Sequence, residues 1–167
     1  MGHFAVQIAK ALGAAVTATT SAANLEMVRG LGAEEVLDYA LGDPAAGRAG
    51  YDVVFDAGGW LTLGQNRRLL RPGGIAVLAG AGPHPNLAGI AGRLVEAQVR
   101  SRLDSRRYVS YLANRTPEDL EFLRSMLESG QLRPVIDRRY GLDEIREAVR
   151  YQETGHARGK VAVRIAR

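Results

Sequence analysis

The sequence contains no cysteine, so it forms no disulfide and offers no thiolate for a metal site or a nucleophile. No stretch of it resembles a signal peptide, and no apolar run approaches the roughly 18 residues that span a bilayer. We therefore expect no membrane association and, by default, a cytoplasmic location. Lysine is scarce as well: only Lys10 and Lys160 stand among the 22 basic residues, a bias typical of a GC-rich coding sequence.

The net charge of +4 raises the question of nucleic-acid binding. Much of this charge comes from residues 93–107, where five arginines outnumber two acidic residues. No nucleic-acid motif and no interleaved aromatic residues accompany the segment, so we expect no specific nucleic-acid partner. His3, His84 and His156 are scattered without the spacing of metal ligands, so we expect no metal either.

The most informative stretch is residues 51–80, which we interpret as strand, helix and strand. Residues 53–55 and 75–78 are short runs that are apolar on both faces, as in a parallel sheet covered by helices on each side. The helix between them can turn Leu63 and Leu69 toward the sheet. Glycines follow both strands, at the carboxyl ends where open α/β sheets bind their ligands.

The remaining pattern alternates helices and strands. It predicts helices at 3–12, 24–31, 116–130 and 142–152, and strands at 15–20, 35–39, 109–112, 134–137 and 160–165. The Gly- and Pro-rich residues 81–92 are expected to form a loop on the ligand side. This order indicates an α/β fold with a doubly wound parallel sheet. On the first helix we expect Phe4, Ile8 and Leu12 to face inward and Gln7 to face water.

Such a fold normally begins with a strand and a glycine-rich turn that holds a pyrophosphate at the amino end of the first helix. Here the helix comes first, and only Gly2 remains of such a turn. An acidic residue at the end of the next strand would bind the ribose of NAD. The sequence has the neutral hydrogen-bond donors Thr20 and Ser21 instead, which favours NADP and leaves NAD open.

Several stretches together resemble medium-chain dehydrogenase/reductases, and among them the zinc-free branch similar to quinone oxidoreductases. They are GHFAVQIAK at 2–10, LGAEEVLDY at 31–39, YDVVFDAGG at 51–59, LLRPGG at 69–74 and PVIDRRYGLDEIREAVRYQETGHARGKVAV at 134–163. The resemblance covers essentially the whole chain, and the tail is its most specific part. It implies an NAD(P)-dependent oxidoreductase without a metal, in which hydride passes from NADPH to a small quinone, enone or carbonyl substrate.

The resemblance also implies cofactor contacts. They are Gly2 in the pyrophosphate turn, Thr20, Ser21 and Asn24 at the adenosine 2′-phosphate, Tyr39 beside it, Ala57, Gly58, Ala79, Gly80, Ala81 and Gly82 after two strands, and Arg158, Gly159 and Lys160 in the returning tail. One departure is that residues 22–24 hold no Lys or Arg, which the family usually has there. We assign no catalytic residue, because in this branch the protein mainly positions the nicotinamide and the substrate.

The resemblance divides the chain into an incomplete dinucleotide-binding domain, residues 1–130, and a segment of an absent catalytic domain, residues 131–167. We hypothesise that Met1 replaces a valine and that the first strand is missing, through truncation or a misassigned start. A central strand of this kind contributes on the order of 5–10 kcal/mol. Its loss would split the sheet and expose edges beside residues 51–80. We therefore expect the chain alone to be poorly stable and inactive, unless another subunit, as in a homodimer, fills the gap.

Simpler interpretations remain open for individual residues. Thr20 and Ser21 can act as a helix cap, and Tyr39 can be a packing residue. Asp56 resembles a catalytic acid, but an acid that ends a buried strand more often accepts neighbouring backbone N–H groups. Two other functions also remain: a class I S-adenosylmethionine-dependent methyltransferase, which shares the sheet and LLRPGG but prefers an acid at Thr20–Ser21, and a non-catalytic remnant or interaction domain.

Overall fold

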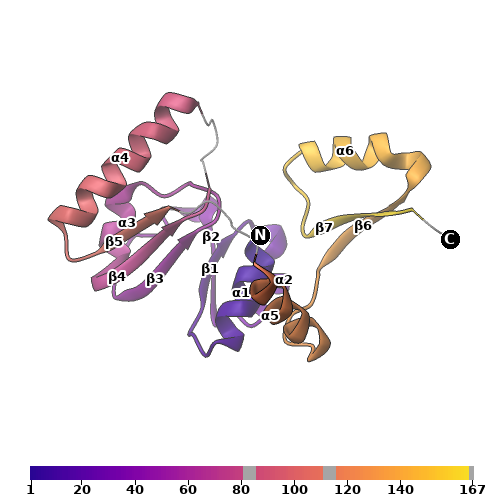
Figure 1. Cartoon of the computed structure of the whole chain (residues 1–167), viewed down its shortest axis with the longest axis horizontal. Helices are drawn as coiled ribbons and strands as arrows, with labels where there is room; N and C mark the ends of the chain where they lie inside the picture. The colour runs from indigo at the N-terminus through magenta and orange to yellow at the C-terminus, as the bar shows by residue number, and fades with distance from the viewer. Residues whose placement is uncertain (81–85, 111–115, 166–167) are drawn as a thin grey trace. The chain divides into compact units, whose positions relative to one another are not determined.

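The computed structural model describes residues 1–80, 86–110 and 116–165 (Figure 1). The chain forms two compact units, one made of residues 1–40 together with 116–167, and one made of residues 41–115. Each unit is described by itself. Within the described ranges, no helix is both long and apolar enough to cross a membrane.

The unit of residues 41–115 is built on a three-stranded parallel sheet (Figure 1). Its strands, in spatial order, are β3 (Tyr51–Asp56), β4 (Leu70–Leu78) and β5 (Arg107–Ser110). Helix α3 (Leu63–Leu69) joins β3 to β4, and helix α4 (Leu87–Leu103) lies between β4 and β5 in the chain. This arrangement confirms the strand–helix–strand interpretation of residues 51–80.

The core of this unit lies between the sheet and its helices. Its buried members are Leu63, Leu70, Ala76, Leu78, Ala97 and Tyr108. Helix α3 begins with a capping box, in which the Thr62 hydroxyl accepts the Gln65 N–H at 3.1 Å and the Gln65 side chain accepts the Thr62 N–H at 2.9 Å. Leu63 and Leu69 are buried as expected, and apolar burial of this kind is the main force that holds a helix to a sheet.

Strand β3 is less covered than its sequence suggested. The side chains of Val53 and Phe55 are 56% and 39% exposed, so the expectation of cover on both faces is wrong for this strand. Val54 packs against the core on one face of the strand, so Val53 and Phe55, which alternate with it, lie on the opposite face, which the helices of this unit leave uncovered.

The second unit begins with α1 (Gly2–Ala11), β1 (Thr17–Thr20), α2 (Leu25–Gly30) and β2 (Glu35–Asp38). A 3₁₀ turn (Ala22–Asn24) precedes α2. Strands β1 and β2 form their own parallel pair, and the buried residues Val6, Val28, Ala33 and Val36 pack beside it. Parallel strands connected through helices in both units confirm the predicted α/β class.

Helix α1 buries a different face from the one expected. Gln7 is 6% exposed and His3 is also buried, whereas Leu12 is 70% exposed. The Gln7 amide is buried because it finds backbone partners: Nε2 donates to the Arg133 carbonyl at 3.0 Å, and Oε1 accepts the Arg133 N–H at 2.8 Å. A buried polar group is tolerated when it is paired in this way.

The same unit continues with residues 116–165. Its elements are α5 (Pro117–Glu128), β6 (Ile136–Gly141), the 3₁₀ turn Leu142–Glu144, α6 (Ile145–Glu153) and β7 (Lys160–Arg164), with β6 and β7 parallel. Helix α5 starts as its sequence predicted, because Thr116 caps it and accepts the Asp119 N–H at 3.1 Å, with Pro117 in the first turn.

Several expected boundaries were misplaced, and the strand expected at 134–137, for example, runs over Ile136–Gly141 instead. Residues 87–92 belong to α4 rather than to a loop, because Asn86 caps this helix and accepts the Gly89 N–H at 2.6 Å. Residues 81–85 lie outside the described part of the chain. The strand expected at 109–112 begins earlier, at Arg107, and its last two expected residues also lie outside the described part.

Candidate cofactor-binding site

At the carboxyl end of β3, the buried side chain of Asp56 organises the loop that follows. Its carboxylate accepts three consecutive backbone N–H groups, from Gly59 at 2.8 Å, Trp60 at 3.1 Å and Leu61 at 3.3 Å. This geometry confirms the structural interpretation of Asp56. A carboxylate used in this way holds the backbone and is not a free general acid.

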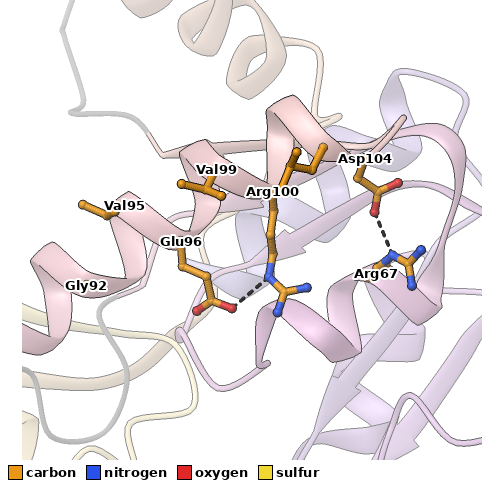
Figure 2. A pocket seen from close by; sticks show the side chains of 8 residues that line it. Arg67, Gly92, Val95, Glu96, Val99, Arg100 and Asp104 are labelled. Carbon is orange, nitrogen blue, oxygen red and sulfur yellow. Dashed lines mark hydrogen bonds and ion pairs between the residues drawn. The ribbon is translucent and has the colours of Figure 1, made fainter.

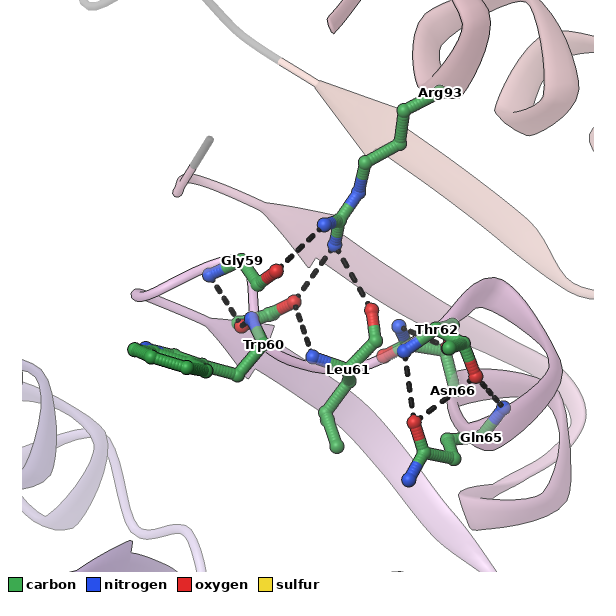
Figure 3. Close-up of polar contacts among 8 residues, drawn as sticks. Gly59, Trp60, Leu61, Thr62, Gln65, Asn66 and Arg93 are labelled. Carbon is green, nitrogen blue, oxygen red and sulfur yellow. Dashed lines mark hydrogen bonds and ion pairs between the residues drawn. The ribbon is translucent and has the colours of Figure 1, made fainter. Parts of the chain in front are cut away.

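Arg93 of α4 completes this arrangement (Figure 3). One terminal nitrogen donates to Asp56 Oδ2 at 2.8 Å and to the Leu61 carbonyl at 3.1 Å, and the other donates to the Gly59 carbonyl at 2.8 Å. A charge-assisted pair shielded from water is stronger than an exposed one. The pairing of Arg93 with Asp56 could not be predicted from the sequence, because Arg93 is one of five arginines in the basic segment and lies 37 residues from Asp56.

The loops after β3 and β4 are packed backbone to backbone. A Cβ added at Gly80 would come within 2.2 Å of the Gly58 carbonyl carbon and 2.7 Å of the Ala57 carbonyl oxygen. The N–H groups of Ala79 and Gly80 both lie 3.1 Å from the Asp56 carbonyl oxygen. The structure thus brings four of the predicted site residues together at one edge of the sheet. The neighbouring predicted residues Ala81 and Gly82 lie outside the described part.

In the other unit, polar residues gather at the carboxyl end of β1. Asn24 Nδ2 donates to Ser21 Oγ at 3.2 Å, and Thr20 is the last residue of the strand. Ser21 occupies the cap position of the 3₁₀ turn without a side-chain capping bond, so capping alone does not explain it. Tyr39 directly follows β2 and is 57% exposed, more than a packing residue normally is.

The amino end of α1, which contains Gly2, lies beside the start of β7. Lys160 Nζ is 5.5 Å from the centre of the Phe4 ring, and the imidazole of His3 lies 4.1 Å from the same ring. Burial lowers the pKa of His3, and the positive charges of the chain's amino group and of Lys160 lower it further. Positive charge at the amino end of a helix is a setting that favours an anion.

The turn that carries Arg158 is held in place by its neighbours. The Asp137 carboxylate accepts the Arg158 N–H at 2.9 Å and the Tyr151 hydroxyl at 2.6 Å. These bonds, first that from Tyr151, lower the pKa of Asp137. Gly159 is required by close packing, because a Cβ there would lie 2.3 Å from the carbonyl oxygen of Val135. The predicted tail contacts therefore sit on a defined turn.

A hollow of about 550 Å³ runs along α4 (Figure 2). Its lining residues are Arg67, Gly92, Val95, Glu96, Val99, Arg100, Leu103 and Asp104. Two ion pairs of 2.8 Å border it, Arg67 with Asp104 and Arg100 with Glu96. None of the residues at the strand ends lines it, so we do not regard it as the cofactor site. In the described ranges, no group of three or more His, Cys, Asp or Glu could hold a metal ion.

Parallel strands joined by helices, with glycines packed at the strand ends, define a domain of the doubly wound nucleotide-binding class. The chain matches the model of the zinc-binding dehydrogenase family over residues 31–163 and therefore belongs to that family. This match agrees with the resemblance to medium-chain dehydrogenase/reductases and confirms the class that the sequence predicted.

Several similar proteins are named as oxidoreductases. The chloroplast envelope quinone oxidoreductase homolog of Arabidopsis thaliana is 31% identical, over 98% of this chain and 49% of that protein. The mitochondrial NAD(P)H oxidoreductase RTN4IP1 of Mus musculus is 29% identical, over 99% of this chain and 45% of that protein. The structure of the quinone oxidoreductase from Coxiella burnetii superposes with a TM-score of 0.79, at 31% identity, over 99% of this chain and 49% of that one. The chain thus spans about half the length of these relatives.

Proposed function

We propose that this chain is the cofactor-binding part of an NAD(P)-dependent oxidoreductase that passes hydride from NADPH to a small quinone, enone or carbonyl substrate. The observation that carries the proposal is the close-packed edge at the ends of β3 and β4, where Gly80 lies against Ala57 and Gly58. A sheet edge of this kind is where doubly wound domains hold nucleotides. Family membership and the named oxidoreductases among the relatives support it.

Each group of site residues has a role in this proposal. The amino end of α1, with Gly2 and Lys160, receives the pyrophosphate, because free N–H groups and a cation favour negative charge there. The other contacts are Thr20, Ser21, Asn24 and Tyr39 at the adenosine end, Ala57, Gly58, Ala79, Gly80, Ala81 and Gly82 at the nicotinamide side, and Arg158 and Gly159 in the tail.

The proposed cofactor is NADP rather than NAD. The hydroxyl groups of Thr20 and Ser21 can donate to phosphate oxygens, and neither side chain carries a charge that would repel a 2′-phosphate. The bound cofactor supplies the hydride, while the protein binds and orients it. We propose no resident metal, because the sequence has no cysteine and its three histidines are widely spaced.

We also propose a division between residues 1–130, a dinucleotide-binding domain, and residues 131–167, which pack on a catalytic domain outside these 167 residues. The exposed apolar side chains of Leu142, Ile145 and Val149 support this division, because they leave a face around α6 uncovered. A homodimer is the alternative cover for such a face. A cytoplasmic location stays a prediction, since the relatives named above are called chloroplast and mitochondrial proteins.

A charge placed at the end of β1 tests the cofactor assignment. Thr20→Glu should weaken NADPH binding at least tenfold, because a carboxylate there repels the 2′-phosphate, and should leave NADH binding nearly unchanged. Thr17→Glu, at the other end of the same strand, is the matched control and should change neither. Affinities are measured by calorimetry. Equal losses for NADPH and NADH, or no loss for either, would contradict the assignment of Thr20 to the 2′-phosphate.

A further inference from the structure

Trp60 stands out in the loop after β3, because it is the only tryptophan of the chain and is 72% exposed. A single exposed apolar side chain is common on protein surfaces and needs no explanation by itself. Two further features distinguish Trp60: how firmly its backbone is held, and where the loop lies.

The backbone on both sides of Trp60 is fixed. The Asp56 carboxylate accepts the N–H groups of Gly59, Trp60 and Leu61, and the Arg93 guanidinium donates to the carbonyl groups that precede and follow Trp60. Five backbone groups of this exposed loop are thus bound to two side chains that are themselves paired at 2.8 Å. The indole is therefore presented from a rigid support.

One edge of the indole is also supported. A Cβ at Gly58 would lie 2.3 Å from Cδ1 and 2.6 Å from Nε1 of Trp60, so the pyrrole edge rests directly on the Gly58 backbone. Figure 3 shows the indole extending from the loop on the side away from Arg93 and Asn66. The remainder of the ring stays open to a ligand. The bound backbone and the supported edge hold the indole near the end of β3 before any ligand arrives, which lowers the entropic cost of binding.

We propose that Trp60 is a stacking platform for a planar conjugated ring bound at the carboxyl end of β3, and that Arg93 is the residue that positions it. The inference rests on the proposed function, because it assumes a nucleotide or its substrate at this edge of the sheet. An indole face attracts flat, conjugated rings through dispersion and its quadrupole. The proposed function puts the nicotinamide and the quinone substrate at this end of the sheet, so the ring is expected to belong to one of these, and AMP tests the adenine as the alternative source.

The test compares Trp60→Leu and Trp60→Phe with the wild-type chain. Each is titrated calorimetrically with NADPH, AMP, nicotinamide mononucleotide and menadione, and with inorganic pyrophosphate as a probe that has no ring. Trp60→Leu should weaken binding of the stacked compound about tenfold, Trp60→Phe should weaken it less, and pyrophosphate should bind equally to all three. Leu41→Ala, which removes an 87% exposed side chain of the same unit, should change nothing. Circular dichroism confirms that each variant keeps its fold.

Arg93 is tested through a signal that a merely stabilising residue would not change. Wild-type Trp60 fluorescence should be quenched saturably by the stacked compound, while Arg93→Lys, which keeps the charge but cannot bridge both carbonyls, should lose most of this quenching at unchanged helix content. The stacked ring is identified by the compound whose affinity changes when residue 60 is substituted: AMP for the adenine, nicotinamide mononucleotide for the nicotinamide, and menadione for a quinone. Unchanged affinities of Trp60→Leu for all four ring compounds would refute the platform while NADPH binding still supports the proposed function. Failure of the wild-type chain to bind any ring compound would refute both.

Discussion

The side-chain amide of Gln7 exchanges two hydrogen bonds with the backbone of Arg133, one in each direction, across 126 residues of sequence. It thereby joins the first helix of the chain to the segment that leads into β6. Nε2 of Gln7 also donates to the His3 carbonyl at 2.8 Å, so both ends of the amide are used. This buried side chain thus links residues from opposite ends of the chain within one unit.

Gln7→Leu should lower the free energy of unfolding by about 1–3 kcal/mol, because it leaves the N–H and carbonyl of Arg133 without these partners. Urea titration in the presence of a stabilising osmolyte measures the change, since we expect the chain to be only marginally stable. Lys10→Leu, on the same helix as Gln7, removes an exposed ion pair with Glu34; it is the control and should cost less than about 1 kcal/mol. Equal costs for both variants would contradict the role of Gln7.

Asp56→Asn should destabilise the chain by about 3 kcal/mol, since it leaves the Arg93 guanidinium without its counter-charge in a largely buried setting. Arg93→Met should have a similar effect, and the double variant should cost less than the sum of the two. A double-mutant cycle by urea unfolding measures this coupling, expected at about 1–3 kcal/mol. A coupling near zero would show that the two side chains act independently.

Glycine substitutions separate positions where backbone packing requires glycine from those where it does not. Gly80→Ala should be strongly destabilising, by about 3 kcal/mol or more, because its Cβ would meet the backbone of Gly58 and Gly59. Gly58→Ala should cost less, since its Cβ meets only the movable side chain of Trp60. Gly92→Ala in α4 is the control: its Cβ meets nothing within 4 Å, so helix propensity should stabilise the chain by about 0.5–1 kcal/mol. Thermal unfolding ranks the three variants.

Asp104 should make the stability depend on pH at the acid end. Burial alone would raise the pKa of Asp104, but hydrogen bonds from Arg67 and Arg106 outweigh it and hold the pKa at about 2, below the ordinary 3.8. A carboxyl group with a lowered pKa stabilises the fold above its unfolded pKa, and this contribution is lost as the pH falls from about 4 to about 2. Asp104→Asn should therefore be less stable than wild type at pH 7, and the difference should shrink through that window. A difference that stays constant from pH 7 to pH 2 would exclude this account.

The sequence was a good guide wherever neighbours along the chain decide the structure. The periodicity of Leu63 and Leu69 placed α3 on its sheet, and the Thr116–Pro117 pair marked the start of α5 correctly. The apolar strand β3 was also found, but the exposure of one of its faces depends on which elements pack over it. Periodicity alone does not report that, so the cover over Val53 was overestimated.

The errors at Gln7 and Arg93 share one physical origin, which is a partner distant in sequence; the missed start of α4 does not, because Asn86 caps that helix locally. Gln7 was expected in water because nothing in α1 explains its burial, and its partner is Arg133. Asp56 was expected to bind backbone N–H groups, which is local and correct, but the guanidinium of Arg93 comes from another helix. At the candidate site, the glycines after β3 and β4 were found from sequence, whereas the mutual packing that requires Gly80 was not visible there.

A comparative titration tests the central claim most directly. The 167-residue chain is titrated by calorimetry with NADPH and, separately, with S-adenosylmethionine, the ligand of the rival methyltransferase interpretation. We predict saturable binding of NADPH and no binding of S-adenosylmethionine. Saturable binding of S-adenosylmethionine, or binding of neither compound by a folded chain, would contradict the assignment of this chain as the cofactor-binding part of an NAD(P)-dependent oxidoreductase.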